Sequence, residues 1–109
     1  MHELGIVQDL IAHAVEAAGG RPLKRIHAAL GELSDVSPQA LNFYFEELRT
    51  RSPAADAALA IRIEPGGARC LACECEFAVA GQEACPACGS IRWQVTAGDR
   101  LVLEAVEVE

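Results

Sequence analysis

The chain has 109 residues, of which 51% are hydrophobic and 23% are charged, and its formal net charge is -7. This length and composition predict one globular domain and exclude a disordered chain. The acidic balance argues against nucleic acid and an anionic membrane as partners, because both attract clusters of Lys and Arg.

The N-terminal segment lacks the pattern of a signal peptide or a membrane span. Its first ten residues contain no Lys or Arg, and Gln8, Asp9 and His13 interrupt the apolar stretch. A signal peptide needs a basic start and a continuous apolar run, and a span needs about 20 apolar residues. We therefore expect a cytoplasmic protein. Its five cysteines then indicate metal binding or catalysis before disulfides, and their odd number argues against a fully paired set.

Hydrophobic periodicity predicts a helix followed by a strand in the first third of the chain. The helical positions recur at intervals of three and four residues, and Gly19-Gly20 with Pro22 ends the helix. The apolar stripe consists of Val7, Leu10, Ile11, Ala14, Val15 and Ala18. Residues 25–33 alternate as a strand, with Ile26, Ala28 and Leu30 on one face.

A second helix and two more strands follow. Ser37-Pro38 is typical of an N-cap followed by proline at the first helical position. The helix behind it places Leu41, Phe45 and Leu48 on one stripe, with Tyr44 beside them. Residues 59–64 alternate as a strand that Pro65-Gly66-Gly67 closes, and LVLEAVEVE after Gly98-Asp99 forms the last strand. Its alternation slips at Glu104 and Ala105, which predicts a β-bulge.

These elements predict an α+β fold with a small three-stranded sheet and two helices. A zinc-ribbon-like insert with four paired cysteines, which has too few large side chains for a core of its own, is expected before the last strand. We expect residues 1–65 and 99–109 to form the core and residues 66–98 to form the insert.

Two CxxC motifs in the insert predict a metal site made of Cys70, Cys73, Cys85 and Cys88. Two residues between thiols allow a tight turn to direct both sulfurs at one ion, and two such turns complete a tetrahedral zinc site. Iron in a rubredoxin-like site and a redox CxxC pair are the alternatives. Cys75 is interpreted as a surface or packing cysteine rather than a fifth ligand.

The first three residues, Met1-His2-Glu3, offer a second metal site. The Met1 amine, the His2 amide nitrogen and His2 Nδ1 can close two fused chelate rings, which suits square-planar Ni(II) or Cu(II). Glu3 is the nearest candidate for a fourth ligand or for a group that orients the site. The alternative is an exposed chain end without a metal role. His13 lies outside the apolar stripe and is expected to be exposed, and His27, on the strand face opposite Ile26, is expected to be either packed or exposed. Neither has ligand spacing to His2.

Several segments, taken in order, resemble the HypA/HybF family of nickel metallochaperones, which act in [NiFe]-hydrogenase maturation and in some organisms also serve urease. The matching segments are MHELGIVQDL, GELSDVSPQALNFYFEEL, LAIRIEP, CLAC…CPACGS and LVLEAVEVE. A departure is Glu74-Cys75 after the first CxxC, where relatives often have glycine. The resemblance covers nearly the whole chain and implies a carrier that is not an enzyme.

The resemblance also implies the roles of individual residues. His2 is then the essential nickel ligand, and the Met1 amine, the His2 amide and Glu3 complete or support the site. The four CxxC cysteines are then ligands of a structural zinc ion. The implied partners are a HypB-type GTPase and the hydrogenase large-subunit precursor, with urease maturation proteins as further candidates and no nucleic acid or membrane.

Two other functions remain open from the residues alone. The first is a zinc-ribbon module for protein interaction or nucleic-acid association, although only Arg69, Arg92 and Trp93 near the insert suit nucleic acid. The second is a redox carrier with iron bound to the thiolates. Hydrolytic and nucleotide chemistry lack support, because no phosphate-loop motif or acid–base pair is recognisable.

Overall fold

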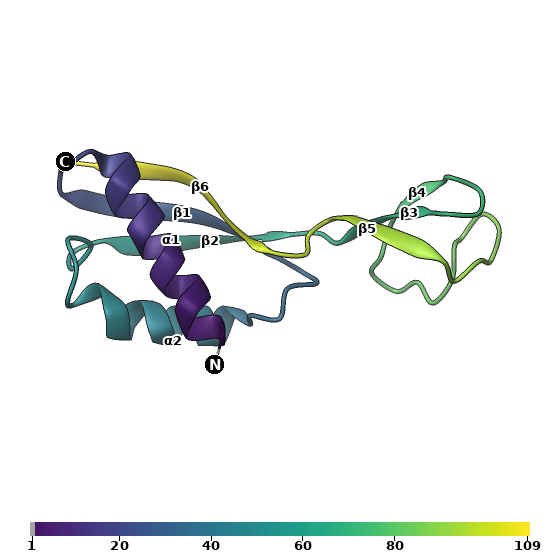
Figure 1. Cartoon of the computed structure of the whole chain (residues 1–109), viewed down its shortest axis with the longest axis horizontal. Helices are drawn as coiled ribbons and strands as arrows, with labels where there is room; N and C mark the ends of the chain where they lie inside the picture. The colour runs from purple at the N-terminus through teal and green to yellow at the C-terminus, as the bar shows by residue number, and fades with distance from the viewer. Residues whose placement is uncertain (1) are drawn as a thin grey trace.

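The structure is a computed structural model that describes residues 2–109, with side chains from Glu3 onward. The molecule is elongated, with extents of 51 × 25 × 17 Å. Figure 1 shows the helices and one sheet at one end and a smaller sheet at the other. Among residues 2–109, no helix has the length and apolar character needed to cross a membrane.

Two helices and two three-stranded sheets make up the fold. The first sheet has the order β2-β1-β6, with β1 parallel to β2 and antiparallel to β6, and the second has the order β4-β3-β5. The predicted α+β fold is confirmed, while the second sheet was not predicted. The elements are α1 (His2–Ala18), β1 (Leu23–Gly31), α2 (Pro38–Arg49), β2 (Ala58–Glu64), β3 (Gly67–Cys70), β4 (Glu76–Ala78), β5 (Trp93–Ala97) and β6 (Leu101–Val108).

The helix ends follow the predicted signals. Gly19 and Gly20 stop α1 in left-handed conformations, with φ of 60° and 86°. Such φ values carry little steric cost for glycine. Ser37 caps α2, because its Oγ accepts a hydrogen bond of 3.1 Å from the Ala40 amide, and Pro38 is the first helical residue. These signals set the lengths of both helices.

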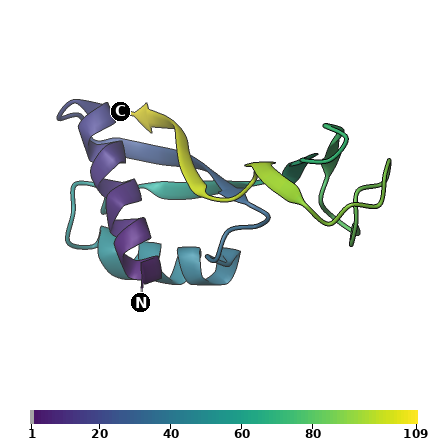
Figure 2. The same cartoon turned by 45° about the vertical axis from the view of Figure 1, so that its right-hand side comes forward.

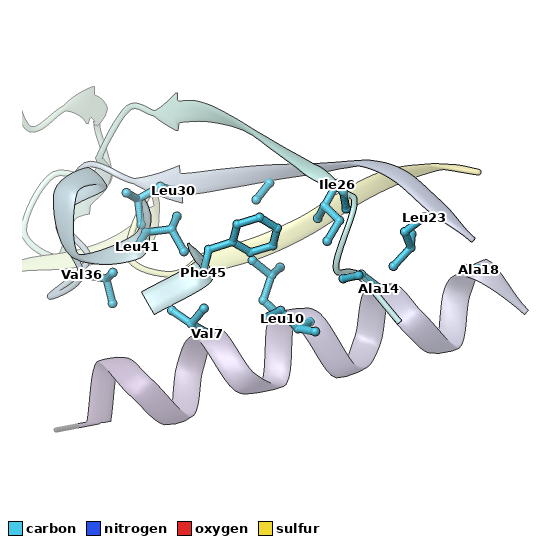
Figure 3. Packing of buried hydrophobic residues seen from close by; sticks show 14 residues of the cluster. Val7, Leu10, Ala14, Ala18, Leu23, Ile26, Leu30, Val36, Leu41 and Phe45 are labelled. Carbon is cyan, nitrogen blue, oxygen red and sulfur yellow. The ribbon is translucent and has the colours of Figure 1, made fainter. Parts of the chain in front are cut away.

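Both helices cover one face of the first sheet and share one core with it (Figures 1 and 2). Figure 3 shows Val7 and Leu10 of α1 facing Phe45 of α2 and the strands behind. Ile26 at the centre of β1 is fully buried, as expected for the inward face of that strand. The core therefore depends on β1, which contributes to it along its whole length.

The predicted irregularity in the last strand is a β-bulge at Glu104. Ala105 faces His27 while Leu103 faces the next residue, Ala28, so Glu104 is the extra residue. Leu101 and Leu103 before the bulge pack against the core, and so do Val106 and Val108 after it. Without an extra residue, strict alternation would turn the last two valines to the opposite face. The bulge thus keeps the whole strand amphipathic.

The sheet face opposite the helices carries ion pairs. Arg62 on β2 contacts Glu64 at 2.9 Å and Glu104 at 2.7 Å. His27 Nε2 lies 2.6 Å from the carboxylate of Glu107, so this histidine is half-buried and hydrogen-bonded. The hydrogen bond from Arg62 lowers the pKa of Glu104, and the contact with His27 lowers the pKa of Glu107.

Truncation of the central strand tests the core. Ile26→Ala is expected to reduce the free energy of unfolding by about 2–5 kcal/mol, because it removes buried methyl groups and leaves a cavity. Ile63→Ala is the matched control on the same sheet, since Ile63 is 50% exposed, and it should cost less than about 1 kcal/mol. Urea unfolding followed by circular dichroism measures both, and equal losses would contradict the described core.

The ion pair at the bulge predicts a pH dependence. The folded-state pKa of Glu104 lies below its ordinary value of 4.5, so its contribution to stability is present above that value. It is lost as the pH falls through the folded-state pKa. Glu104→Gln should therefore lose less stability than the parent chain on acidification in this range, as measured by thermal unfolding at a series of pH values. Glu83→Gln, in an exposed loop, should keep the parent slope.

Candidate metal centre

Four cysteine sulfurs gather at the end of the molecule that lies away from the helices. Their Sγ atoms all lie within 4.8 Å of one another. Cys70 lies 3.6 Å from Cys88, and Cys73 lies 3.6 Å from Cys85. In each CxxC motif the first cysteine is buried and the second is exposed. The structure thus brings together all four cysteines that the spacing selected.

The two motifs fold into equivalent turns. Amides of Ala72 and Cys73 donate to Cys70 Sγ at 3.3 and 3.4 Å, and the Ala87 amide donates to Cys85 Sγ at 3.4 Å. The amide of the fourth residue after each first cysteine bonds back to that cysteine's carbonyl, at 2.9 Å for Glu74 and 2.8 Å for Gly89. Backbone N–H groups therefore face the sulfurs and favour their ionised form.

The two turns differ at their last position. Gly89 has φ of 80°, and Glu74 at the equivalent position has φ of 66°, the one positive φ of a non-glycine residue in the described chain. Such a conformation costs a residue with a side chain about 1 kcal/mol. The carboxylate of Glu74 forms an ion pair with Arg69 on β3. The sequence already shows the difference, because CLACE has Glu74 where CPACG has Gly89. The role of Arg69 was not predicted, because its ion pair with Glu74 depends on the fold of β3.

The sulfur arrangement fits a tetrahedral ion. Metal–sulfur bonds of about 2.3 Å place the corners of a tetrahedron about 3.8 Å apart, which is close to the 3.6 Å between Cys70 and Cys88 and between Cys73 and Cys85. Four ligands of one kind also fill the coordination sphere and leave no position for a substrate. The arrangement is therefore that of a structural metal site rather than a catalytic one.

The thiol pKa values show what the cluster requires. The backbone hydrogen bond from Cys73 lowers the pKa of Cys70 to about 6. The backbone hydrogen bond from Cys75 lowers the pKa of Cys73, but partial desolvation of its sulfur and the neighbouring sulfurs together raise it to about 12. Nearby thiolates repel one another, and the neighbouring Cys70 sulfur likewise raises the pKa of Cys88. A bound cation stabilises all four thiolates, so binding releases protons.

Cys75 lies outside the group of four. It is half-buried, and its Sγ lies 3.6 Å from the Glu76 carbonyl. Its own carbonyl accepts a hydrogen bond of 2.9 Å from the Cys70 amide. Its backbone therefore supports the first turn, and its sulfur points to a different neighbour.

The predicted N-terminal site falls at the limit of the described residues. Met1 and the side chain of His2 lie outside them, while the backbone places His2 as the first residue of α1. Glu3 follows in the first turn and is half-buried. This end of α1 belongs to the helical part of the molecule, away from the four cysteines (Figures 1 and 2). His13 is exposed, as expected.

Comparison with known proteins decides the family. Residues 1–108 match the family model described as hydrogenase/urease nickel incorporation, metallochaperone, hypA. The chain belongs to the HypA family. It is 36% identical to hydrogenase maturation factor HypA of Geobacter metallireducens over 110 residues, with both chains covered completely. It is 37% identical to HypA of Nostoc sp., with 100% of this chain and 96% of the relative covered.

A solved HypA structure supports the same assignment. The solution structure of the Ni metallochaperone HypA from Helicobacter pylori matches with a TM-score of 0.78 and 27% identity, over 97% of this chain and 96% of that one. The predicted resemblance is therefore confirmed, and so is the function of a nickel metallochaperone in hydrogenase maturation.

Single cysteine replacements test the metal centre. Cys85→Ser should abolish stable metal retention, because the harder hydroxyl oxygen of serine replaces one of the four thiolate sulfurs. Cys75→Ser is the matched control and should retain about one metal ion per chain. Mass spectrometry of metals in the purified proteins measures both. Metal loss from Cys75→Ser, or full retention by Cys85→Ser, would contradict the four-sulfur site.

Proposed function

We propose that this HypA-family chain carries one Ni(II) ion at its N-terminus and one Zn(II) ion in its insert. The Met1 amine, the His2 amide nitrogen and His2 Nδ1 bind the nickel, and Glu3 completes or supports the site. The zinc ligands are Cys70, Cys73, Cys85 and Cys88. Residues 1–65 and 99–109 form the nickel-binding core, and residues 66–98 form the zinc-binding insert.

The four-sulfur cluster carries this proposal. A closed tetrahedral site has no open position through which cargo could enter or leave by ligand exchange. A carrier therefore needs a second metal site. Among residues with described side chains, no other group of three His, Cys, Asp or Glu lies at metal-binding separation. This supports placing the cargo at Met1 and His2.

The start of α1 suits such a chelate. The first amides of a helix have no intrahelical acceptor, so ligation by the His2 amide nitrogen breaks no helical hydrogen bond. The positive end of the helix dipole disfavours a cation, but the deprotonated amide and the acidic Glu3 in the first turn offset it. The site is therefore open yet electrostatically balanced.

Delivery follows from three nitrogen ligands in a plane. The fourth position is either open or held by the exchangeable carboxylate of Glu3, so a ligand of the recipient can enter it and transfer can begin before any chelate bond breaks. Proton uptake by the amine and the imidazole then assists release, because both must be deprotonated to hold nickel. We propose a HypB-type GTPase as the partner in this transfer and the [NiFe]-hydrogenase large-subunit precursor as the recipient, with urease maturation proteins as further candidates. The chain acts in the cytoplasm and is not an enzyme.

A nickel titration tests the N-terminal site. His2→Ala should weaken nickel binding more than about 100-fold, because it removes one nitrogen ligand and a chelate ring, while the zinc content stays unchanged. His13→Ala is the matched control, since His13 is an exposed histidine of the same helix. Calorimetry on protein with its native N-terminus measures the affinities. Unchanged binding by His2→Ala would remove the proposed site.

An extension before Met1 gives an independent test. It converts the α-amine into an amide and should weaken nickel binding, whereas the same residues added after Glu109 should not. The same titration compares the two proteins. Equal affinities would exclude the α-amine as a ligand even if His2 still contributes.

A further inference from the structure

The two sheets are joined by a narrow neck in which three parts of the chain meet. Residues 65–66 lead from β2 into β3, and residues 98–100 lead from β5 back into β6. Residues 31–33, the last residue of β1 and the two that follow it, lie against both connections. Figure 1 shows the two connections running side by side between the core and the insert.

Successive backbone amides of this segment bond to both sides of the neck. The Gly31 amide donates to the Arg100 carbonyl at 2.9 Å, and the Leu33 amide donates to the Gly98 carbonyl at 2.7 Å. Between them, the Glu32 amide donates to the Glu64 carbonyl at 2.8 Å. The segment therefore ties the outgoing connection to the returning one.

The backbones in the neck are in direct contact. Gly98 has φ of 76°, and a Cβ on it would lie 2.5 Å from the Pro65 carbonyl oxygen. A Cβ on Gly31 would overlap the Gly98 carbonyl. Both glycines and Gly66 are buried. A Cβ on Gly66 would lie 2.7 Å from Leu33 Cγ, so the Leu33 side chain packs directly against this glycine.

The Glu32 side chain forms a hydrogen bond within the neck. Glu32 Oε1 accepts a hydrogen bond of 2.8 Å from the Gly66 amide. On its other side, the Gly66 carbonyl accepts a hydrogen bond of 2.9 Å from Val79, which belongs to the insert. Gly66 is therefore held by the core through its amide and by the insert through its carbonyl. This bond requires an acceptor oxygen at the reach of the Glu32 side chain.

The same segment continues into the helical core. Val36 is buried, and Figure 3 shows it beside Val7 of α1. We propose that Glu32 is a positioning residue that fixes the orientation of the four-cysteine insert relative to the core. In terms of the proposed function, it fixes the geometry in which a partner in nickel transfer meets the two metal-bearing parts.

The carboxylate of Glu32 can be altered in length or in charge. Glu32→Ala removes the acceptor. Glu32→Asp keeps the charge but shortens the side chain by one methylene, and Glu32→Gln keeps the length and an acceptor oxygen. Glu47→Ala on α2 is the control for loss of an exposed glutamate. All variants are studied as full-length protein with zinc in the four-cysteine site and without nickel. The outcome is therefore independent of the nickel site.

Two nuclear magnetic resonance measurements report on the neck. Hydrogen exchange of the Gly66 amide reports on the hydrogen bond itself. Residual dipolar couplings, fitted separately for the core and for residues 66–98, report whether the two parts share one alignment. We expect one shared alignment in the parent, Glu32→Gln and Glu47→Ala proteins. Glu32→Ala and Glu32→Asp should exchange the Gly66 amide at least about tenfold faster and show reduced couplings in the insert.

The outcomes separate the acceptor geometry from charge and from folding. Unchanged exchange and one shared alignment in Glu32→Ala would overturn the proposal. So would a loosened Glu32→Gln together with an unaffected Glu32→Asp, because charge rather than reach would then hold the neck. If Glu32→Ala loses its metal, the comparison of the Asp and Gln variants decides.

Discussion

The fold depends on how the chain leaves and re-enters the first sheet. The insert lies between β2 and β6, and these strands flank β1 on opposite sides. Adjacent strands lie about 4.8 Å apart, so β2 and β6 are separated by about twice that distance. To enter one narrow insert, they must converge at the end of β1. Gly31, Gly66 and Gly98 allow this close approach, and Glu32 adds the one side-chain hydrogen bond described between the segment after β1 and the neck.

Beyond the neck, a cluster of four cysteine sulfurs takes the place of a hydrophobic core. The buried apolar residues of the insert are Ala68, Cys70 and Cys85, and the two cysteines belong to that cluster. Phe77 and Trp93 add an edge-to-face pair at 4.9 Å. Such a small apolar contribution is expected to make the folding of this part depend on the proposed metal ion. The helical core has an apolar cluster of its own, which separates the proposed structural metal from the proposed cargo.

Local signals in the sequence predicted most of the fold. Features that depend on contacts between distant parts of the chain were not predicted. The caps at Ser37 and Gly19, the apolar stripes and the bulge at Glu104 depend on neighbouring residues, so periodicity and turn chemistry predict them. The four-cysteine cluster was predictable because CxxC spacing reflects one turn. The second sheet was missed because its strands of three to five residues are too short to show alternation. The roles of Arg69 and Glu32 were not predictable from spacing, since they depend on the tertiary fold, and the N-terminal chelate stays a prediction.

The pairing of β1 with β6 also governs the order in which the chain can fold during synthesis. The helices, β1 and β2 emerge first, and they leave one edge of β1 without a partner. An unpaired edge of this kind favours association between chains. The insert emerges next and can bind its metal and fold before β6 is available. If the insert binds zinc as proposed, a nascent chain short of zinc would keep that edge exposed for longer, because β6 would then be tethered by a long flexible loop. Metal supply is therefore expected to influence aggregation during translation as well as the stability of the finished protein.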